Sequence, residues 1–116
     1  METKDTITYL DFTKLDLKIG KIISVEDVPD SRKLLLFKVD IGGEERTILG
    51  GFKKSYGETK ESLIGKQVVV LKNLEAKEIA GLKSEGMILA ATGTNGEPVF
   101  LTSDNLEFTE AGCEVR

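Results

Sequence analysis

"LKIGKIISVEDV", residues 17–28, is the stretch that decides the fold. Apolar and polar residues alternate at its start, and the apolar run then continues through Ile22 and Ile23. This pattern is typical of a long β-strand. Gly20 lies inside the stretch and predicts a bulge or a sharp bend at that point. The fold therefore begins with one long, bent strand.

Further strand-like segments follow, separated by turn residues. Pro29, Asp30 and Ser31 form a turn, and Gly42-Gly43 joins two strands as a hairpin. One short helix is expected to begin with Thr59 as its possible N-cap and to stop at Gly65. The connection 73–85 is expected to be a long loop. After the first strand, the expected strands are 33–41, 44–49, 66–72, 86–91 and 99–103.

The order of these elements favours one architecture. Three strands, a short helix and two further strands form the arrangement of the five-stranded OB-fold barrel. A β-sandwich or an SH3-like barrel has similar strands, but the helix position and the bent first strand favour the OB-fold. We predict one all-β domain over 1–116, with the barrel at about 15–92 and a C-terminal extension. OB-folds bind oligonucleotides with the face of strands two and three and the loop after strand four.

Composition excludes several functions. The chain has no histidine and a single cysteine, Cys113, so it lacks the residues of a zinc cluster or a Ser-His or Cys-His dyad. We expect no enzyme activity, no metal and no cofactor. The apolar runs are too short to cross a membrane, and residues 1–9 lack the apolar core of a signal peptide. The lone cysteine fits a reducing cytoplasm.

The charge is unevenly distributed along the chain. The net charge is −4, but residues 31–83 carry eleven Lys/Arg against seven Asp/Glu, a balance of +4. Residues 94–116 carry five acidic residues against Arg116 alone, a balance of −4. A basic middle segment can still present a positive face to nucleic acid. On charge alone, an ordinary mixed-charge surface is the alternative.

Four blocks of sequence occur in order and together resemble the tRNA-binding domain family: "DFTKLDLKIGKI" (11–22), "SRKLLLFKVDIG" (31–42), "LIGKQVVVLKNL" (63–74) and "GLKSEGMILAA" (81–91). This family includes the C-terminal domain of bacterial methionyl-tRNA synthetases, the beta subunits of archaeal ones and stand-alone dimeric tRNA-binding proteins. The resemblance implies an OB-fold that binds tRNA largely by shape. It also implies a homodimer in which the segments 1–14 and 93–116 form the contact.

The resemblance and the residue chemistry together give two sets of candidate residues. The apolar residues of the terminal segments are expected at the dimer interface, or alternatively they seal the barrel ends within one chain: Phe12, Leu15, Leu106 and Phe108. The expected tRNA contacts are Lys33, Arg46, Lys72, Asn73, Lys77, Ser84, Glu85 and Met87.

Each tRNA contact is expected for a chemical reason. Lysine and arginine side chains position phosphates, although Arg46 and Lys72 contribute only if they face the same groove as Lys33 and Lys77. The Asn73 amide offers donors and an acceptor to a base edge or a 2′-hydroxyl, or it closes its strand as an Asx turn.

The stretch 84–87 has two interpretations. As a binding rim, Met87 packs on a base or ribose, Gly86 permits close approach of the backbone, and Ser84 and Glu85 hydrogen-bond a base edge. As ordinary structure, Met87 fills the core and Ser84-Glu85 is a solvated turn. The family resemblance favours the rim.

Three functions remain open. The first is a non-catalytic, dimeric tRNA-binding module that raises the effective tRNA concentration for methionyl-tRNA synthetase. The second is a peptide-binding, export-chaperone-like dimer on the same fold, suggested by the acidic pI of about 4.9. The third is a dimerisation domain whose tRNA contacts have decayed, suggested by Glu75 and Glu78. A start at Met1 favours a free-standing chain.

Overall fold

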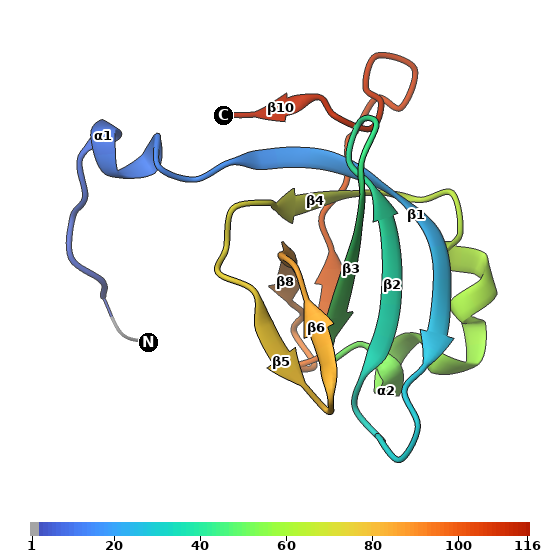
Figure 1. The fold of residues 1–116 in the computed structure, drawn as a ribbon. Coiled ribbons are helices and arrows are strands. Elements are labelled where there is room, and N and C mark those ends of the chain that lie inside the picture. The colour runs from blue at the N-terminus through green and yellow to red at the C-terminus, as the bar shows by residue number, and fades with distance from the viewer. Residues whose placement is uncertain (1–2) are drawn as a thin grey trace.

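The computed structural model describes residues 3–116 as a nearly closed β-barrel with little helix (Figure 1). The helices are α1 (Tyr9–Phe12), α2 (Lys53–Tyr56) and the 3-10 helix η1 (Gly57–Leu63). The strands are β1 (Leu17–Asp27), β2 (Leu35–Asp40), β3 (Glu45–Gly50), β4 (Gln67–Leu71), β5 (Lys77–Ile79), β6 (Leu82–Ser84), β7 (Met87–Ile88), β8 (Ala90–Thr92), β9 (Pro98–Phe100) and β10 (Glu114–Val115). None of the helices in this part of the chain is long and apolar enough to cross a membrane.

The long first strand organises the barrel. The main sheet has the order β3-β2-β1-β4-β7, in which β1 pairs with β4 through residues 17–21 and with β2 through residues 21–27. The barrel closes between β3 and the segment around β6 and β7. There the Glu85 N–H donates to the Thr47 carbonyl at 2.8 Å, and the Leu49 N–H donates to Ser84 Oγ at 3.0 Å. The predicted five-stranded all-β barrel is therefore confirmed.

Gly20 lies where β1 passes from one partner strand to the other. A Cβ atom at this position would lie 2.5 Å from Val39 Cγ1 and 3.0 Å from Val70 Cγ2. The glycine therefore leaves room for side chains of β2 and β4 to meet inside the barrel. The irregularity in the β1–β2 ladder falls between Ile22 and Ser24, so the bulge is displaced from the glycine that predicted it.

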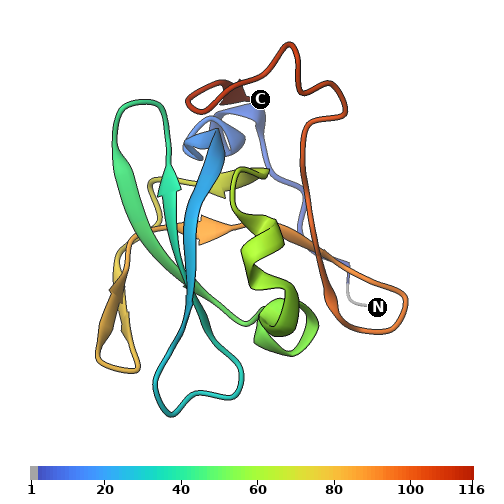
Figure 2. The same cartoon turned by 90° about the vertical axis from the view of Figure 1, so that its right-hand side faces the viewer.

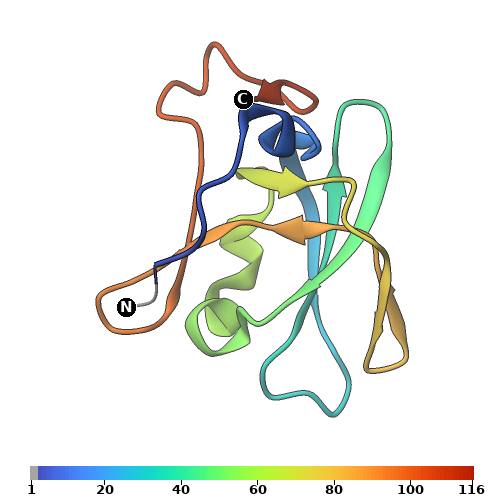
Figure 3. The ribbon, with the colours of Figure 1, turned by 90° about the vertical axis from the view of Figure 1, so that its left-hand side faces the viewer.

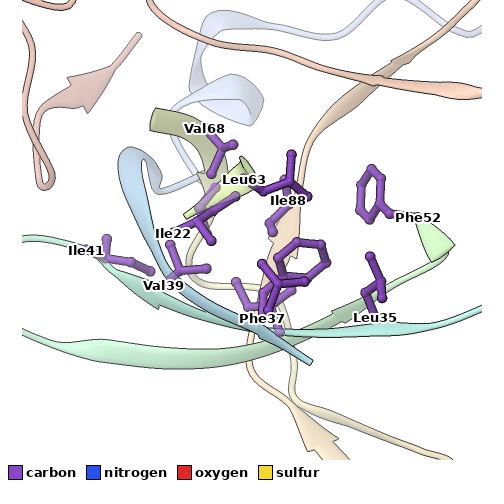
Figure 4. Close-up of a cluster of buried hydrophobic side chains, with 12 residues drawn as sticks. Ile22, Leu35, Phe37, Val39, Ile41, Phe52, Leu63, Val68 and Ile88 are labelled. Carbon is purple, nitrogen blue, oxygen red and sulfur yellow. The ribbon is translucent and has the colours of Figure 1, made fainter. Parts of the chain in front are cut away.

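The core is apolar and is drawn from most of the barrel strands (Figure 4). On β2 the alternation is strict, with Leu35, Phe37 and Val39 buried. Phe37 meets Phe52 edge-on with ring centroids 5.6 Å apart. Other buried members of this cluster are Ile22, Val25, Ile41, Ile48, Leu63, Val68, Val70 and Ile88.

The helical connection is longer than expected. It begins at Lys53 as α2 and continues as η1 to Leu63, on the side of the barrel that Figure 2 presents to the viewer. Thr59 lies inside η1 with non-helical φ and ψ, where two helical turns meet at a kink. The helical segment begins at Lys53, directly after the buried Phe52, so Thr59 is not its N-cap as expected.

Two further expectations are wrong near the C-terminal half of the barrel. The connection 73–85, expected as a loop, contains the β5–β6 hairpin, so residues 82–84 are a strand. The expected strand 86–91 is divided: β7 pairs with β4, whereas β8 leaves the barrel and pairs with β9. The short strand expected at 99–103 is observed as β9, which begins and ends earlier.

The two terminal segments lie outside the barrel. The N-terminal segment with α1 stands away from the body in Figure 1 and crosses in front of the barrel in Figure 3, and none of the α1 residues is buried. The C-terminal segment returns along the barrel and ends in β10, which pairs with β1 at Leu17 and Lys18.

Candidate nucleic-acid interface

The β5–β6 hairpin forms one wall of a groove on the outside of the barrel. The groove has a volume of 620 Å³. Its lining is largely apolar, with a lysine and two glutamates at its edge: Leu49, Leu74, Glu75, Ala76, Lys77, Glu78, Ile79, Ser84, Gly86 and Met87. We call it the hairpin groove. Its apolar lining with polar groups at the margin is typical of small ligand sites.

Met87 lies at the rim of the hairpin groove. Its side chain is 46% exposed, although its neighbour Ile88 is buried in the core. Met87 is therefore not core filler, and its predicted contact with tRNA stays a prediction. Gly86 has φ +130°, and a Cβ atom there would lie 2.9 Å from the Leu71 carbonyl oxygen. The strand can therefore approach β4 closely enough to present Met87 only because residue 86 is glycine.

Ser84 has a structural position in the same wall. It is 5% exposed, and its Oγ accepts a hydrogen bond from the buried Leu49 N–H. The Ser84 hydroxyl therefore joins β6 to β3 at the groove. Ser84 lies in a strand, not in a solvated turn, and its hydroxyl is not freely exposed.

Arg46 stabilises the mouth of the barrel. It lies opposite Val39 in the β2–β3 ladder, so its side chain leaves the sheet on the core side. Its Nη1 donates to the Lys72 carbonyl at 3.2 Å and to the Glu85 carbonyl at 3.4 Å. Arg46 thus connects β3 to the two chain segments that enter and leave the hairpin.

Glu44 bridges Arg46 and Lys72. One carboxylate oxygen lies 2.6 Å from Lys72 Nζ, and the other lies 3.3 Å from Arg46 Nε. The hydrogen bond from Lys72 holds the pKa of the Glu44 carboxyl below its usual value against an opposing effect of burial, and Arg46 lowers the pKa further. The two predicted contacts Arg46 and Lys72 are therefore brought together, but with a carboxylate between them.

Asn73 fastens the N-terminal segment to β4. Its Oδ1 accepts from the Asp16 N–H at 2.8 Å, and its Nδ2 donates to the Lys14 carbonyl at 2.7 Å. The Lys72 N–H adds a third bond to the Asp16 carbonyl at 2.8 Å. The Asn73 amide thus has one structural bond on each polar atom, and a bound base edge would have to share these atoms.

A second hollow lies at the tip of the hairpin. Ala80 of the hairpin and the β1–β2 loop, residues 29–34, line a space of 620 Å³ that includes Arg32 and Lys33. All three ribbon views show the hairpin tip and this loop at the same end of the barrel (Figures 1, 2 and 3). Lys33 is thereby separated from Met87 by the length of the hairpin.

Several cations of the hairpin, the β1–β2 loop and β2 have no ion pair within the described residues. Within residues 3–116, seven of the lysines and arginines form ion pairs with carboxylates. The cations of the hairpin, the β1–β2 loop and the exposed face of β2 form none: Arg32, Lys33, Lys38, Lys77 and Lys83. Lys38 and Lys83 were not among the predicted contacts. Lys38 occupies a polar position of a strand that was predicted, so the alternation could have indicated it. Lys83 could have been indicated in the same way only if residues 82–84 had been predicted as a strand.

The predicted dimer residues are mostly exposed. Leu15 and Leu106 are exposed, and Phe108 is 80% exposed, whereas Phe12 is half-buried. The alternative that these side chains seal the barrel is therefore wrong for Leu106 and Phe108. Tyr9 and Leu10 of α1, which were not predicted, are exposed to about the same degree. Amphipathic spacing gave no signal for them because α1 is only one turn long.

Comparisons with known proteins agree with this geometry. The sequence model of the tRNA binding domain family matches residues 17–109. A methionine–tRNA ligase of Pyrococcus furiosus is 44% identical over 110 residues, which are 95% of this chain and 14% of that protein. The chain thus spans about one seventh of the length of this relative.

Two solved structures share the fold over nearly the whole chain. A methionyl-tRNA synthetase related protein from Pyrococcus horikoshii has a TM-score of 0.87 at 28% identity, covering 97% of this chain and 100% of that one. The chaperone CsaA of Bacillus anthracis has a TM-score of 0.83 at 27% identity, with the same coverage.

Proposed function

Because this chain belongs to the tRNA binding domain family, we propose that it is a non-catalytic module that binds tRNA with the hairpin groove and the cations around it. It would act with methionyl-tRNA synthetase, or as its beta subunit or C-terminal domain. The observation that carries this proposal is the position of the exposed Met87 in an apolar groove whose hairpin bears lysines without an ion pair to residues 3–116. The lone cysteine is consistent with work in a reducing cytoplasm.

The groove and the cations suit different parts of an RNA. Unpaired bases need apolar or soft surfaces, which Met87, Leu74 and Leu49 supply. Phosphates need cations that are not already neutralised, which Lys77 and Lys33 supply at the two ends of the hairpin. Contacts of this kind position tRNA by its shape and carry little sequence information.

The module would help a synthetase by proximity. A second tRNA site linked to a catalytic domain raises the effective concentration of tRNA at that domain without a new contact in the active site. We include a homodimer in the proposal, because the exposed apolar residues of α1 and of the C-terminal segment provide surface for a second copy. Two copies would double the cationic surface presented to one tRNA.

The first experiment is a salt titration of binding to bulk tRNA with single-stranded DNA as competitor. We expect binding that prefers tRNA and that weakens with salt at a slope of a few phosphate contacts. Equal affinity for tRNA and single-stranded DNA would contradict recognition by shape.

A charge reversal then tests the surface. Lys33→Glu combined with Lys77→Glu should weaken tRNA binding at every salt concentration and reduce the salt slope by about two contacts. Lys66→Glu is the matched control, since Lys66 is exposed, has no ion pair within the described residues and precedes β4 at the end away from the groove. Unchanged affinity in the double variant would favour a dimerisation domain with decayed contacts.

A peptide-binding chaperone is the second candidate function. The similarity to the chaperone CsaA and the apolar lining of the hairpin groove favour it. Two results together would support this candidate over the first. The protein would bind unfolded peptides at micromolar concentration, with weaker binding in Met87→Ala, and it would not bind tRNA at low salt.

A further inference from the structure

Glu44 holds two cations whose backbone neighbours line the hairpin groove. It lies just before β3, and its two carboxylate oxygens are divided between Lys72 Nζ at 2.6 Å and Arg46 Nε at 3.3 Å. All three side chains are partly exposed, with 24% to 42% of their surface open to solvent. An incoming anion can therefore reach the same cations.

This ion-pair cluster lies beside the backbone segments that line the groove, although none of its three side chains is part of the lining. Lys72 is followed by Asn73 and by Leu74, the first groove residue of the hairpin connection. Arg46 donates to the Glu85 carbonyl, next to Gly86 and Met87 on the other wall. An RNA strand whose base lies on Met87 would bring its backbone close to this cluster.

The cluster differs from the rest of the cationic surface. The lysines of the hairpin have no carboxylate partner within the described residues, whereas Lys72 is held by one. A carboxylate and a phosphate present the same kind of acceptor oxygen to an ammonium group. While Glu44 is bound, it neutralises part of the charge of Lys72. A phosphate therefore interacts with the full charge of Lys72 only after Glu44 is released.

We propose that Glu44 competes with tRNA phosphate for Lys72 and Arg46 and thereby limits the affinity of the hairpin groove for tRNA. This inference rests on the proposed function. In the free protein Glu44 neutralises the cluster; in the complex the phosphate displaces it from Lys72. Glu44 thus sets how many phosphate contacts the protein forms, and with it the salt dependence of binding.

The test compares Glu44→Gln with Glu45→Gln in the full chain, using bulk tRNA over a range of salt concentrations. Both changes raise the net charge by one, but Glu45 lies opposite Asp40 in the β2–β3 ladder and forms no ion pair within the described residues. We expect Glu44→Gln to bind tRNA about threefold to tenfold more tightly at low salt, with a slope steeper by about one contact. Glu45→Gln should change affinity by less than about twofold, because Glu45 holds neither cation of the cluster and its exposed charge is screened.

The route through Lys72 is tested by a double variant. In the Lys72→Gln background, Glu44→Gln should lose most of its effect on tRNA affinity, since the cation that it would free is absent. An equal gain from Glu44→Gln and Glu45→Gln would overturn the inference and leave tRNA binding intact. Weaker binding in Glu44→Gln would overturn it as well, because Glu44 would then be positioning the cations. Failure of the wild-type protein and of Glu44→Gln alike to bind tRNA would overturn the proposed function together with the inference.

Discussion

Met87 shows how a single side chain can be exposed although its strand is buried. Its neighbour Ile88 points into the core, so the alternation of the strand sends Met87 outward. Gly86 then determines how near the strand approaches the Leu71 carbonyl. The soft, unbranched thioether is left at the rim, where it can adapt to an irregular ligand surface.

Replacing Met87 by alanine should weaken tRNA binding by about 1 kcal/mol, roughly a fivefold loss, through lost contact with a base or ribose. The salt slope should stay the same, because no cation is removed. Binding isotherms at several salt concentrations measure both quantities. Val99→Ala is the matched control, since Val99 is 48% exposed and lies on β9, outside the groove. A loss of equal size in both variants would argue against a contact at Met87.

Arg46 and Asn73 show that candidate binding residues can also have structural partners. Arg46 donates to two backbone carbonyls, and the Asn73 amide joins Lys14 and Asp16 to the end of β4. Their predicted contacts with tRNA stay predictions. Replacing either residue would disturb the groove wall as well as any contact, so neither is a clean probe of binding.

Among the elements that form the groove, the β5–β6 hairpin was not predicted from the sequence. Its turn consists of Ala80 and Gly81, both with positive φ, as a type I′ two-residue turn requires. The usual turn pairs for this geometry are Asn-Gly and Asp-Gly, and alanine adopts it only when the surroundings impose it. Strands of three residues also give no periodicity that can be recognised.

Replacing Ser84 by alanine should destabilise the protein by about 1–3 kcal/mol, because the buried Leu49 N–H would lose its acceptor. Chemical denaturation measures the free energy of unfolding. Ser62→Ala is the control: Ser62 is exposed and bonds only within its own helical turn, so its loss should cost less than about 0.5 kcal/mol. Equal unfolding midpoints for the two variants would mean that the Ser84 bond does not contribute to closure of the barrel.

At the scale of the whole molecule, the exposed apolar residues of the terminal segments stand out. Leu10 is 74% exposed, Phe108 is 80% exposed, and both lie outside the barrel. Side chains of this size are stabilised by burial, and a second copy of the chain can provide it. The barrel core does not depend on them, since its buried cluster begins at Ile22.

Leu10→Ser and Phe108→Ser should each weaken self-association about tenfold or more while leaving the unfolding of the barrel nearly unchanged. Sedimentation equilibrium gives the dissociation constant. Ile64→Ser serves as the control, because Ile64 is also an exposed apolar residue, at 51%, but it follows η1 and belongs to neither terminal segment. A wild-type protein that stays monomeric at high micromolar concentration would contradict the dimer.

The sequence by itself determined the strands of the barrel, because alternation along each strand is a local property. It also determined the family resemblance, which rests on four blocks of sequence. The spacing of Leu35, Phe37 and Val39 predicts a buried face of the strand, and this prediction does not depend on which strands lie beside it. Only the tertiary structure decided which polar groups meet. Asn73 binds residues 57 and 59 positions earlier in the chain, and Glu44 pairs with the distant Lys72. Side-chain pairs of this kind leave no local pattern, since they depend on how β3 and β4 are brought together when the barrel closes.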